Sequence, residues 1–192
     1  MGMLKNVRVR IKLIGAFLIV AVLIGIVGGV GIISLKNVGE NAKRMYEQNL
    51  MNVYELTDMK QNLTQIKSNI SDLLNSKDEK EASIKTKLEQ EIQDNKDEND
   101  KYVTELQKSI DGDDEKKIFE EFNNQLIQYR TLRENVVKLI DAGNYTGASQ
   151  QYIEIPKVTD ELFKNLDQLI ELNLKESSEA NDNIVAVYLK ST

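Results

Sequence analysis

The sequence contains no cysteine, no histidine and no tryptophan, and it has one proline among 192 residues. Without Cys or His side chains, zinc-finger, haem and cysteine-protease sites and a Ser-His-Asp triad are excluded. Only all-oxygen metal sites and catalysis by carboxylates or lysine remain. Aromatic residues make up only 6% of the chain, whereas hydrophobic residues reach 41% and charged residues 29%. This composition is typical of long helices rather than of a β-sandwich or barrel, and the length corresponds to about one domain.

One long segment near the N-terminus has no polar side chain. From Leu13 to Ile33 the sequence consists of Leu, Ile, Val, Ala, Phe and Gly. A helix of this length, rising about 1.5 Å per residue, crosses the ~30 Å hydrocarbon layer of a membrane. A cleaved secretion signal has an apolar region of only about 7–15 residues, so the pattern predicts a retained transmembrane helix over residues 13–33.

Charge is distributed unevenly on the two sides of this segment. Residues 1–12 carry four bases and no acid, and the rest of the chain has 21 bases against 31 acids, a net charge of −10. The bases predict a cytoplasmic basic N-terminus over residues 1–12, and residues 34–192 then lie outside the cell membrane. The acidic outer region repels nucleic acid, which we exclude as a partner. The four bases are Lys5, Arg8, Arg10 and Lys12.

Half of the glycines lie within the apolar segment. Gly25 and Gly29 form a small-xxx-small pair, which permits two membrane helices to approach closely. Glycine is also common in membrane helices generally. We therefore regard this pair as a candidate dimer contact of the span.

A stripe with alternating spacings of three and four residues follows the span and predicts a long helix that buries one face. Asn49 and Asn52 interrupt its apolar character, which predicts either control of helix register or a polar opening in the seam. The stripe consists of Leu35, Val38, Ala42, Met45, Asn49, Asn52, Leu56, Met59, Leu63, Ile66, Ile70 and Leu73.

Three further apolar stripes occupy residues 84–110, 119–140 and 158–187, with a short helical stretch expected around 148–152. Charged or glycine-containing turns at 76–81, 111–115 and 141–144 separate them, and Pro156 marks the beginning of the last helix or a kink in it. Four stripes joined by short polar turns predict an all-α fold. The expected architecture is an antiparallel up-down four-helix bundle that is continuous with the transmembrane helix and occupies residues 34–192.

Catalytic and metal sites find no support in this pattern. The acidic turn that begins at Asp111 resembles a calcium loop, but Lys116 and Phe122 stand where an EF-hand needs Gly and Glu. The other carboxylates are spread over solvated helical faces, whereas a catalytic pair needs two carboxylates in one desolvated cleft. We therefore predict no metal site, no cofactor and no enzymatic activity.

Three segments resemble the extracytoplasmic sensor half of bacterial methyl-accepting chemotaxis receptors. They are LKNVRVRIKL at residues 4–13, which runs directly into the span, MYEQNL at 45–50 in the long stripe, and LIDAGNYTGA at 139–148 at the turn between the third and fourth helices. The last segment is similar to a recurrent Gly-polar-x-x-Ala turn of the family. The resemblance that these segments and their order carry extends over nearly the whole chain.

The resemblance implies a homodimeric receptor with a four-helix-bundle ligand-binding domain. It implies that a small-molecule ligand or a partner solute-binding protein binds this domain, and that a conformational signal crosses the membrane for chemotaxis. Family members continue with a second span, a HAMP linker and a cytoplasmic hairpin that acts on downstream cytoplasmic signalling proteins. We therefore interpret the sequence as an N-terminal portion of such a receptor.

Residues for the ligand site can be carried over from the aspartate-sensing members that the chain resembles. These members present three arginines at spacings of five and four on the first helix, and further groups beside a proline near the start of the fourth. The corresponding positions here are Lys60, Gln65 and Asn69, together with Lys157 and Thr159 beside Pro156. Only one of the three cations is retained, so an acidic amino acid is not supported as the ligand, and a neutral or weakly anionic ligand remains open. Lys60 and Lys157 can also be ordinary solvated lysines.

Two other functions remain open at this point. The same sensor module occurs in front of a histidine kinase or a cyclase, and the output domain that would distinguish them follows the sensor in such proteins. A single-span surface protein with a structural or adhesive bundle is the other alternative. The sequence of the next few hundred codons would identify a kinase or cyclase, and hydropathy beyond residue 192 would show whether a second span follows.

Overall fold

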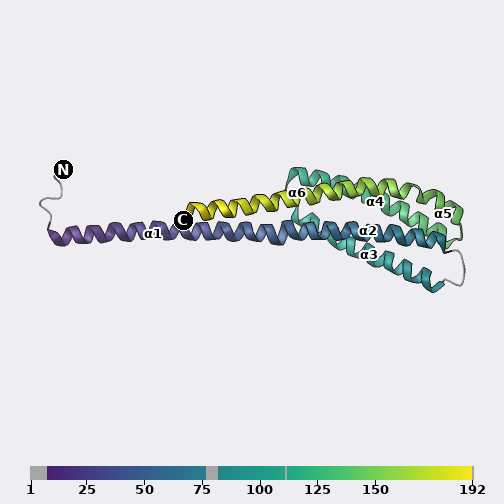
Figure 1. Cartoon of the computed structure of the whole chain (residues 1–192), viewed down its shortest axis with the longest axis horizontal. Coiled ribbons are helices and arrows are strands. Elements are labelled where there is room, and N and C mark those ends of the chain that lie inside the picture. The colour runs from purple at the N-terminus through teal and green to yellow at the C-terminus, as the bar shows by residue number, and fades with distance from the viewer. Residues whose placement is uncertain (1–7, 77–81, 111, 192) are drawn as a thin grey trace. The chain divides into compact units, whose positions relative to one another are not determined.

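The computed structural model describes residues 8–76, 82–110 and 112–191, and within these ranges it contains helices and no strand. The predicted all-α fold is therefore confirmed. Parts of three predicted features lie outside the described residues: the basic N-terminus up to residue 7, the turn at 77–81 and Asp111 of the acidic turn. The elements are α1 (Val9–Lys43), the π-helix η1 (Arg44–Leu50), α2 (Met51–Asn75), α3 (Ala82–Ser109), α4 (Asp113–Asp141), α5 (Tyr145–Tyr152) and α6 (Glu154–Ser191) (Figure 1).

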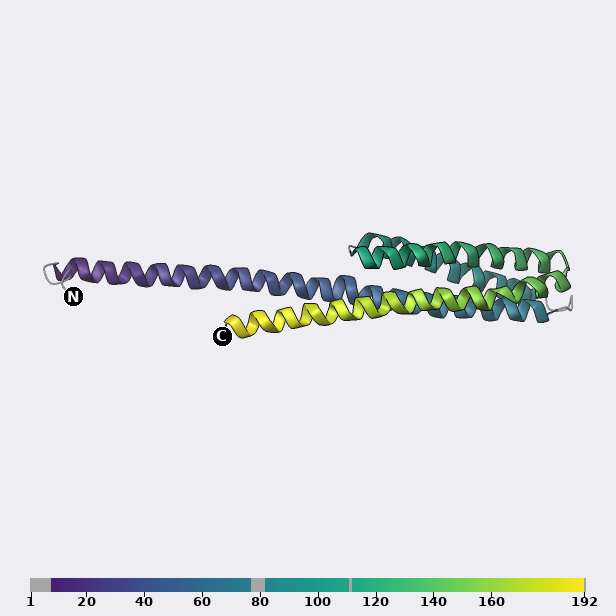
Figure 2. The ribbon, with the colours of Figure 1, turned by 90° about the horizontal axis from the view of Figure 1, so that it is seen from above.

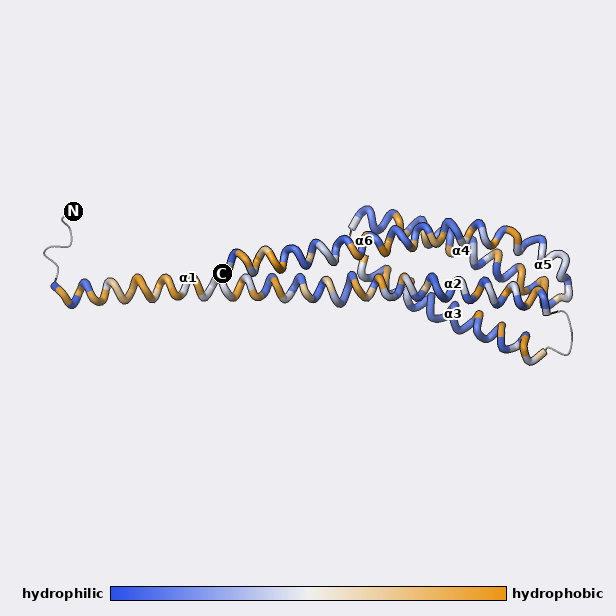
Figure 3. Tube along the Cα trace, in the orientation of Figure 1, coloured by the Kyte–Doolittle hydropathy of each residue, from blue (hydrophilic) through white to orange (hydrophobic). Residues whose placement is uncertain are grey.

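The chain divides into two compact units. The first comprises Met1–Met45 and Ser178–Thr192, and the second comprises Tyr46–Ser177. In the first unit, α1 contains no buried residue, and Phe17, Val27 and Ile32 are each more than 70% exposed. Figure 3 shows that the middle of α1 is mostly hydrophobic, with hydrophilic residues towards its two ends.

Among the described residues, one helix is long and apolar enough to cross a membrane. It runs from Val9 to Asn75, and its most apolar stretch has a mean hydropathy of 2.9 with none of that stretch buried. A core helix of a soluble protein would be buried by its own chain, whereas this stretch presents its side chains outward. The segment predicted to span the membrane, Leu13 to Ile33, lies within this helix.

The second unit is a bundle in which α2, α3, α4 and the first part of α6 run side by side (Figures 1 and 2). In each contacting pair, residue numbers rise along one helix as they fall along the other, so the neighbours are antiparallel, as the short turns predicted. The pairs are α2–α3 (Asn52 with Ser109, Asn69 with Glu91), α3–α4 (Asp100 with Arg130, Lys85 with Asp141) and α4–α6 (Gln125 with Asn165, Glu115 with Asn173).

The core of the bundle lies along the predicted stripes. From Asn49 to Leu73 every predicted stripe position of η1 and α2 is buried. At the other end of the stripe, Leu35 is 73% exposed, and the π-helix Arg44–Leu50 interrupts the α-helical geometry that the unbroken spacing predicts. The fully buried large side chains include Leu56, Met59, Leu63, Ile66, Ile70, Phe122, Tyr129, Ile140, Ile155 and Leu162.

The chain reverses between α4 and α6 through the predicted glycine turn. Gly143 adopts φ +71°, a left-handed conformation that glycine accepts at little cost, and its N–H donates to the carbonyl of Ile140. The side chain of Asn144 then caps α5 by accepting a hydrogen bond of 3.0 Å from the N–H of Gly147. Pro156 lies in the first turn of α6, where a missing N–H costs little.

Candidate functional site

Lys60, the single cation carried over on the first bundle helix, contacts α6. Its Nζ lies 2.6 and 2.8 Å from the two carboxylate oxygens of Asp167 and 5.3 Å from the centre of the Phe163 ring. The lysine side chain is 34% exposed and the aspartate 58%. Lys60 is therefore a partly solvated residue that already has a counter-charge.

Gln65 and Asn69 lie on the side of α2 that faces α3. The Gln65 amide donates to Asn69 Oδ1 at 2.8 Å, and Asn69 Nδ2 donates to Glu91 Oε2 at 3.1 Å. Gln65 and Glu91 also line an open groove of about 460 Å³ together with Asp94 and Asn95. This groove offers amide and carboxylate groups and no cation.

Lys157 and Thr159 both use their polar atoms within α6. Lys157 Nζ lies 2.9 and 3.0 Å from the carboxylate oxygens of Glu154, and the buried Thr159 hydroxyl donates to the carbonyl of Ile155 at 2.8 Å. Within the described part of the chain, the only hydrogen bond that joins two of the five carried-over residues is that between Gln65 and Asn69. The five-residue ligand set stays a prediction.

A polar layer crosses the bundle where the sequence places Asn52 in the seam. Asn52 Nδ2 donates to Asn173 Oδ1 at 2.9 Å, and Asn52 Oδ1 accepts from the Ser109 hydroxyl at 3.0 Å. Asn173 Nδ2 donates to Glu115 Oε1 at 3.1 Å. This polar layer, consisting of Asn52, Ser109, Glu115 and Asn173, joins α2, α3, α4 and α6. It specifies one register, because shifting any helix would leave buried amides unpaired.

A buried carboxyl group lies one helical turn from this layer. Glu55 is only 6% exposed, and its carboxyl group shares a hydrogen bond with that of Glu105. Burial is the main cause that raises the pKa of Glu55 from 4.5 to about 7, and the hydrogen bond to Glu105 and the charge of Glu105 raise it further. The sequence did not predict this pair, because a Glu beside a helical stripe usually points into solvent.

A second groove of about 460 Å³ lies between α3 and α4. Ile92 and Val137 give it apolar walls, and charged side chains surround them. The α3–α4 groove also receives Gln93 and Lys96 from α3 and Lys138 and Asp141 from α4. The interspersed charges of this part of the chain gave no sign of a groove, because they are typical of a solvated helical face.

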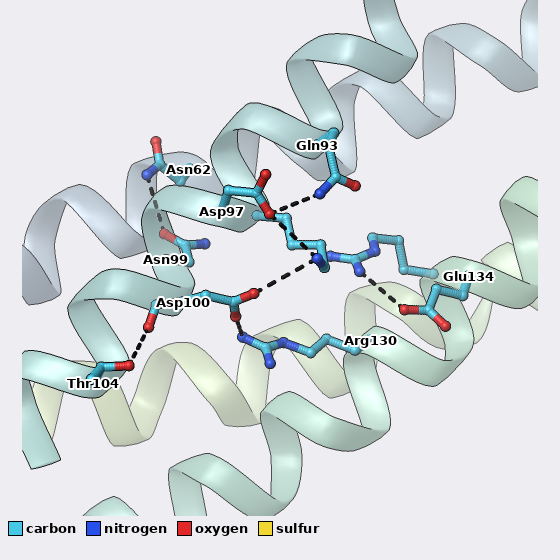
Figure 4. Close-up of polar contacts among 10 residues, drawn as sticks. Asn62, Gln93, Asp97, Asn99, Asp100, Thr104, Arg130 and Glu134 are labelled. Carbon is cyan, nitrogen blue, oxygen red and sulfur yellow. Dashed lines mark hydrogen bonds and ion pairs between the residues drawn. The ribbon is translucent and has the colours of Figure 1, made fainter.

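Ion pairs tie the two helices together beside this groove. Arg130 Nη2 forms an ion pair with Asp100 Oδ1, and Lys96 Nζ lies 3.7 Å from the other oxygen of Asp100 and 3.4 Å from Asp97 (Figure 4). These contacts fix α3 against α4 on one side of the groove and occupy Lys96 with two carboxylates.

Arg133 lines the groove but has little compensation for its charge. Its side chain is only 5% exposed, and its single ion pair in the described structure is a 3.5 Å contact from Nη2 to Glu134 Oε1, on a side chain that is 54% exposed (Figure 4). Burial lowers the pKa of Arg133 from its usual value. The buried hydroxyl of Tyr129, one turn earlier, has no hydrogen-bond partner in the described part of the chain.

A signal for Arg133 was present in the sequence. A step of four residues from Tyr129 leads to Arg133, and a further step of three leads to Val136, so Arg133 occupies a seam position. An apolar stripe takes Leu132 instead, because Leu132 is the hydrophobic residue nearest to that position. Arg133 is buried and Leu132 is only partly buried. A charged residue at a seam position is therefore a candidate site residue that the apolar pattern alone passes over.

The described residues contain no cluster of three or more Asp and Glu side chains that could hold a metal ion.

The comparison with protein families decides what kind of module this bundle is. A family model described as a four helix bundle sensory module for signal transduction matches residues 6–188. The chain belongs to this family, which is the sensory module of methyl-accepting chemotaxis proteins. No similar curated protein and no similar solved structure was found.

Membership of this family says two things about the chain. The match begins before the apolar helix and includes the whole bundle, so the apolar helix and the bundle belong to one sensory module. The family is a receptor domain rather than a catalytic one.

Proposed function

We propose that this protein is the outward-facing sensor of a bacterial chemoreceptor and that it responds to a small ligand or to a solute-binding protein. The observation that carries the proposal is the family match over residues 6–188, which includes both the apolar helix and the bundle. The match to the module of methyl-accepting chemotaxis proteins favours chemotaxis over a histidine kinase, a cyclase or an adhesive surface protein as the context.

The basic residues before the apolar segment support a cytoplasmic N-terminus, and the bundle then faces outward. This orientation exposes the acidic bundle to solutes of the medium. Lys60, Gln65, Asn69, Lys157 and Thr159 remain the ligand site that family resemblance proposes, together with a homodimer in which such sites lie between subunits.

The mechanism of signalling follows from the interior of the bundle. A ligand that prefers one packing of the helices shifts a two-state equilibrium by its differential affinity, typically ~1–3 kcal/mol. The polar layer couples the four helices, because a ligand that displaces one helix disturbs buried hydrogen bonds that the other helices share. The helical segment from α1 to α2 then carries the change toward the membrane.

The orientation can be tested with single cysteines, because the natural chain has none. Ile127 on α4 is 61% exposed and Arg10 at the start of α1 is also exposed, so both sites accept Cys without disturbing the core. In intact cells, a membrane-impermeant maleimide should label Ile127→Cys and should label Arg10→Cys only after the membrane is permeabilised. The reverse pattern would contradict an outward-facing bundle.

Dimerisation and signalling can be tested with the same chain in membranes. Gly25→Cys and Gly29→Cys should form disulfide-linked dimers if the small-xxx-small face joins two spans, with Val27→Cys as a control on another face of the helix. A ligand added from a panel of amino acids, organic acids and sugars should change the rate of disulfide formation. Rates that no compound changes would argue against direct sensing of these compound classes.

A further inference from the structure

We propose that the α3–α4 groove is a binding site for a small monocarboxylate with a short aliphatic chain, and that Arg133 is its anchor. The inference rests on the proposed sensory function and names the ligand class and its place in the bundle. It differs from the five residues carried over by resemblance, which lie on α2 and α6.

Three acids and three bases line the groove, and the acids are engaged more fully than two of the bases. On the acidic side, Asp141 and Glu89 are both engaged by Lys85, whose Nζ lies 2.8 Å from Asp141 Oδ1 and 3.6 Å from Glu89 Oε1. Two of the three acids that line the groove thereby share the single positive charge of Lys85. Glu134 is the third, and it is mostly directed to solvent.

Among the bases, Lys96 forms ion pairs with both Asp97 and Asp100, but neither Arg133 nor Lys138 forms two such ion pairs within the described residues. Lys138 is exposed and forms no ion pair in the described part of the chain, and Arg133 has only the long contact with Glu134. The positive charge of the groove that is least engaged therefore lies at the buried Arg133 and at Lys138, which suits an anion of single charge better than a neutral compound.

Arg133 is the stronger anchor of the two cations because it is buried. A guanidinium group has five N–H donors, and a buried one is stabilised when a carboxylate accepts two of them side by side. The present contacts satisfy at most one of these donors. A carboxylate placed against the guanidinium would supply the missing charge and the missing acceptors at once.

The walls of the groove define the rest of the ligand. Ile92 and Val137 offer apolar surface beside Arg133, and about 460 Å³ is the size of sites that hold small molecules. The remaining carboxylates oppose a second negative charge on the ligand. A carboxylate with a branched or short straight alkyl group fits these features, and both a simple fatty acid and an aliphatic amino acid present that chemistry.

The test is calorimetric titration of the full chain in lipid nanodiscs with butanoate, L-valine and the neutral isostere butanamide. We expect butanoate or L-valine to bind and butanamide not to bind. Binding of butanoate alone would assign the site to simple carboxylic acids, and binding of L-valine alone to amino acids. Absence of binding by both carboxylates at millimolar concentration, or equal binding of butanamide, would overturn the proposal.

Variants locate the site. Arg133→Gln should weaken binding by about 10–100-fold, because it removes a charge-assisted hydrogen-bonded pair, and Arg133→Lys should weaken it less. Lys117→Gln is the control: it removes a positive charge from an exposed position of the same helix outside the groove, and it should alter affinity by less than about threefold. The helical circular dichroism of each variant establishes that it is folded. If Arg133→Gln does not fold, Arg133→Lys and Lys138→Gln provide the same comparison.

The outcome separates this site from the proposed function. Carboxylate binding that is unchanged in Arg133→Gln would refute the groove as the site and leave the sensory function standing. A bundle that cysteine labelling places on the cytoplasmic side would refute the proposed outward-facing sensor even if Arg133 binds the carboxylate.

Discussion

Buried polar side chains give the interior of the bundle its sensitivity to conditions. Glu55 is the clearest case, because its carboxyl group is 6% exposed, lies against Glu105 and has a pKa raised to about 7. The folded state therefore binds a proton at Glu55 more tightly than the unfolded chain does. The stabilisation that this provides is fully present below pH 4.5 and is lost as the pH rises through about 7.

Replacement of Glu55 by Gln should remove this dependence on pH. Gln has the shape of the protonated acid and no charge, so Glu55→Gln and the natural chain should have similar free energies of unfolding near pH 4.5. At pH 8 the variant should be more stable by about 2–3 kcal/mol. Urea denaturation followed by circular dichroism at the two pH values measures the difference.

A control for this measurement is Glu121→Gln, which changes an exposed carboxylate on α4. It should leave the difference in stability between pH 4.5 and pH 8 within about 0.5 kcal/mol of the natural value. If Glu55→Gln keeps the full pH dependence of the natural chain, Glu55 is not the titrating group.

For single residues, the sequence predicted which side chains are buried better than it predicted which polar side chains contact one another. Leu56, Met59 and Leu63 follow the heptad spacing and are buried, because one face of a helix in a bundle must be covered. Asn52 was correctly placed in the seam, but its partners Ser109 and Asn173 come from helices whose relative register the spacing does not determine. Arg133 and Glu55 were missed because charged residues are normally solvated. The spacing from Tyr129 points to Arg133, whereas Glu55 lies beside the stripe, and only the packing of neighbouring helices shows that it is buried.

Each helix ends where the local chemistry of a few residues requires it, and the end of α4 shows this most clearly. Gly143 takes a left-handed conformation, and the N–H of Asn144 reaches back to the carbonyl of Leu139 at 2.8 Å. Apart from Gly143 itself and its neighbours in the chain, no heavy atom lies within 4 Å of the place where a Cβ on Gly143 would stand. The requirement for glycine is therefore conformational and not steric crowding by neighbours.

Gly143→Ala should consequently destabilise the bundle by about 1 kcal/mol, since an alanine at positive φ brings its Cβ close to its own backbone. Gly143→Asn should cost less, because asparagine tolerates this region better than other residues with a side chain. Thermal unfolding of the three proteins measures the order. Equal melting temperatures for the Ala and Asn variants would show that the left-handed conformation does not limit stability.

The sequence predicted the helices of the bundle with their turns, because Gly112, Gly143 and the charged cluster at 76–81 fall between the stripes. It did not predict the π-helix at Arg44–Leu50. A π-helix keeps helical composition and contains no breaker residue, so spacing alone cannot distinguish it from the α-helix on either side. The groove between α3 and α4 was missed for a related reason: it depends on which faces of two helices meet, and the interspersed charges of α3 suit several faces equally well.

At the scale of the whole chain, the exposed apolar surface of α1 determines where the protein resides. A soluble protein rarely exposes a contiguous apolar surface of this size, and the second unit, which buries its stripes, has no comparable helix among its described residues. The apolar helix and the sensory family together indicate a membrane protein. Retention in the membrane should therefore depend on residues of α1 and not on the bundle.

Two aspartates at the centre of the span should release the protein from membranes. In a central position each Asp costs about 3 kcal/mol, whereas each Leu, Ile, Phe or Val contributes only about −0.5 kcal/mol, so Leu23→Asp with Ile24→Asp offsets most of the favourable transfer energy of the segment. We expect the double variant to appear in the alkali-extractable fraction, whereas the natural chain stays in the membrane pellet. Ile127→Asp is the matched control, because Ile127 is 61% exposed on α4, similar to Leu23 at 55% and Ile24 at 67%. If Ile127→Asp releases the chain as effectively, the bundle and not the span holds the protein at the membrane.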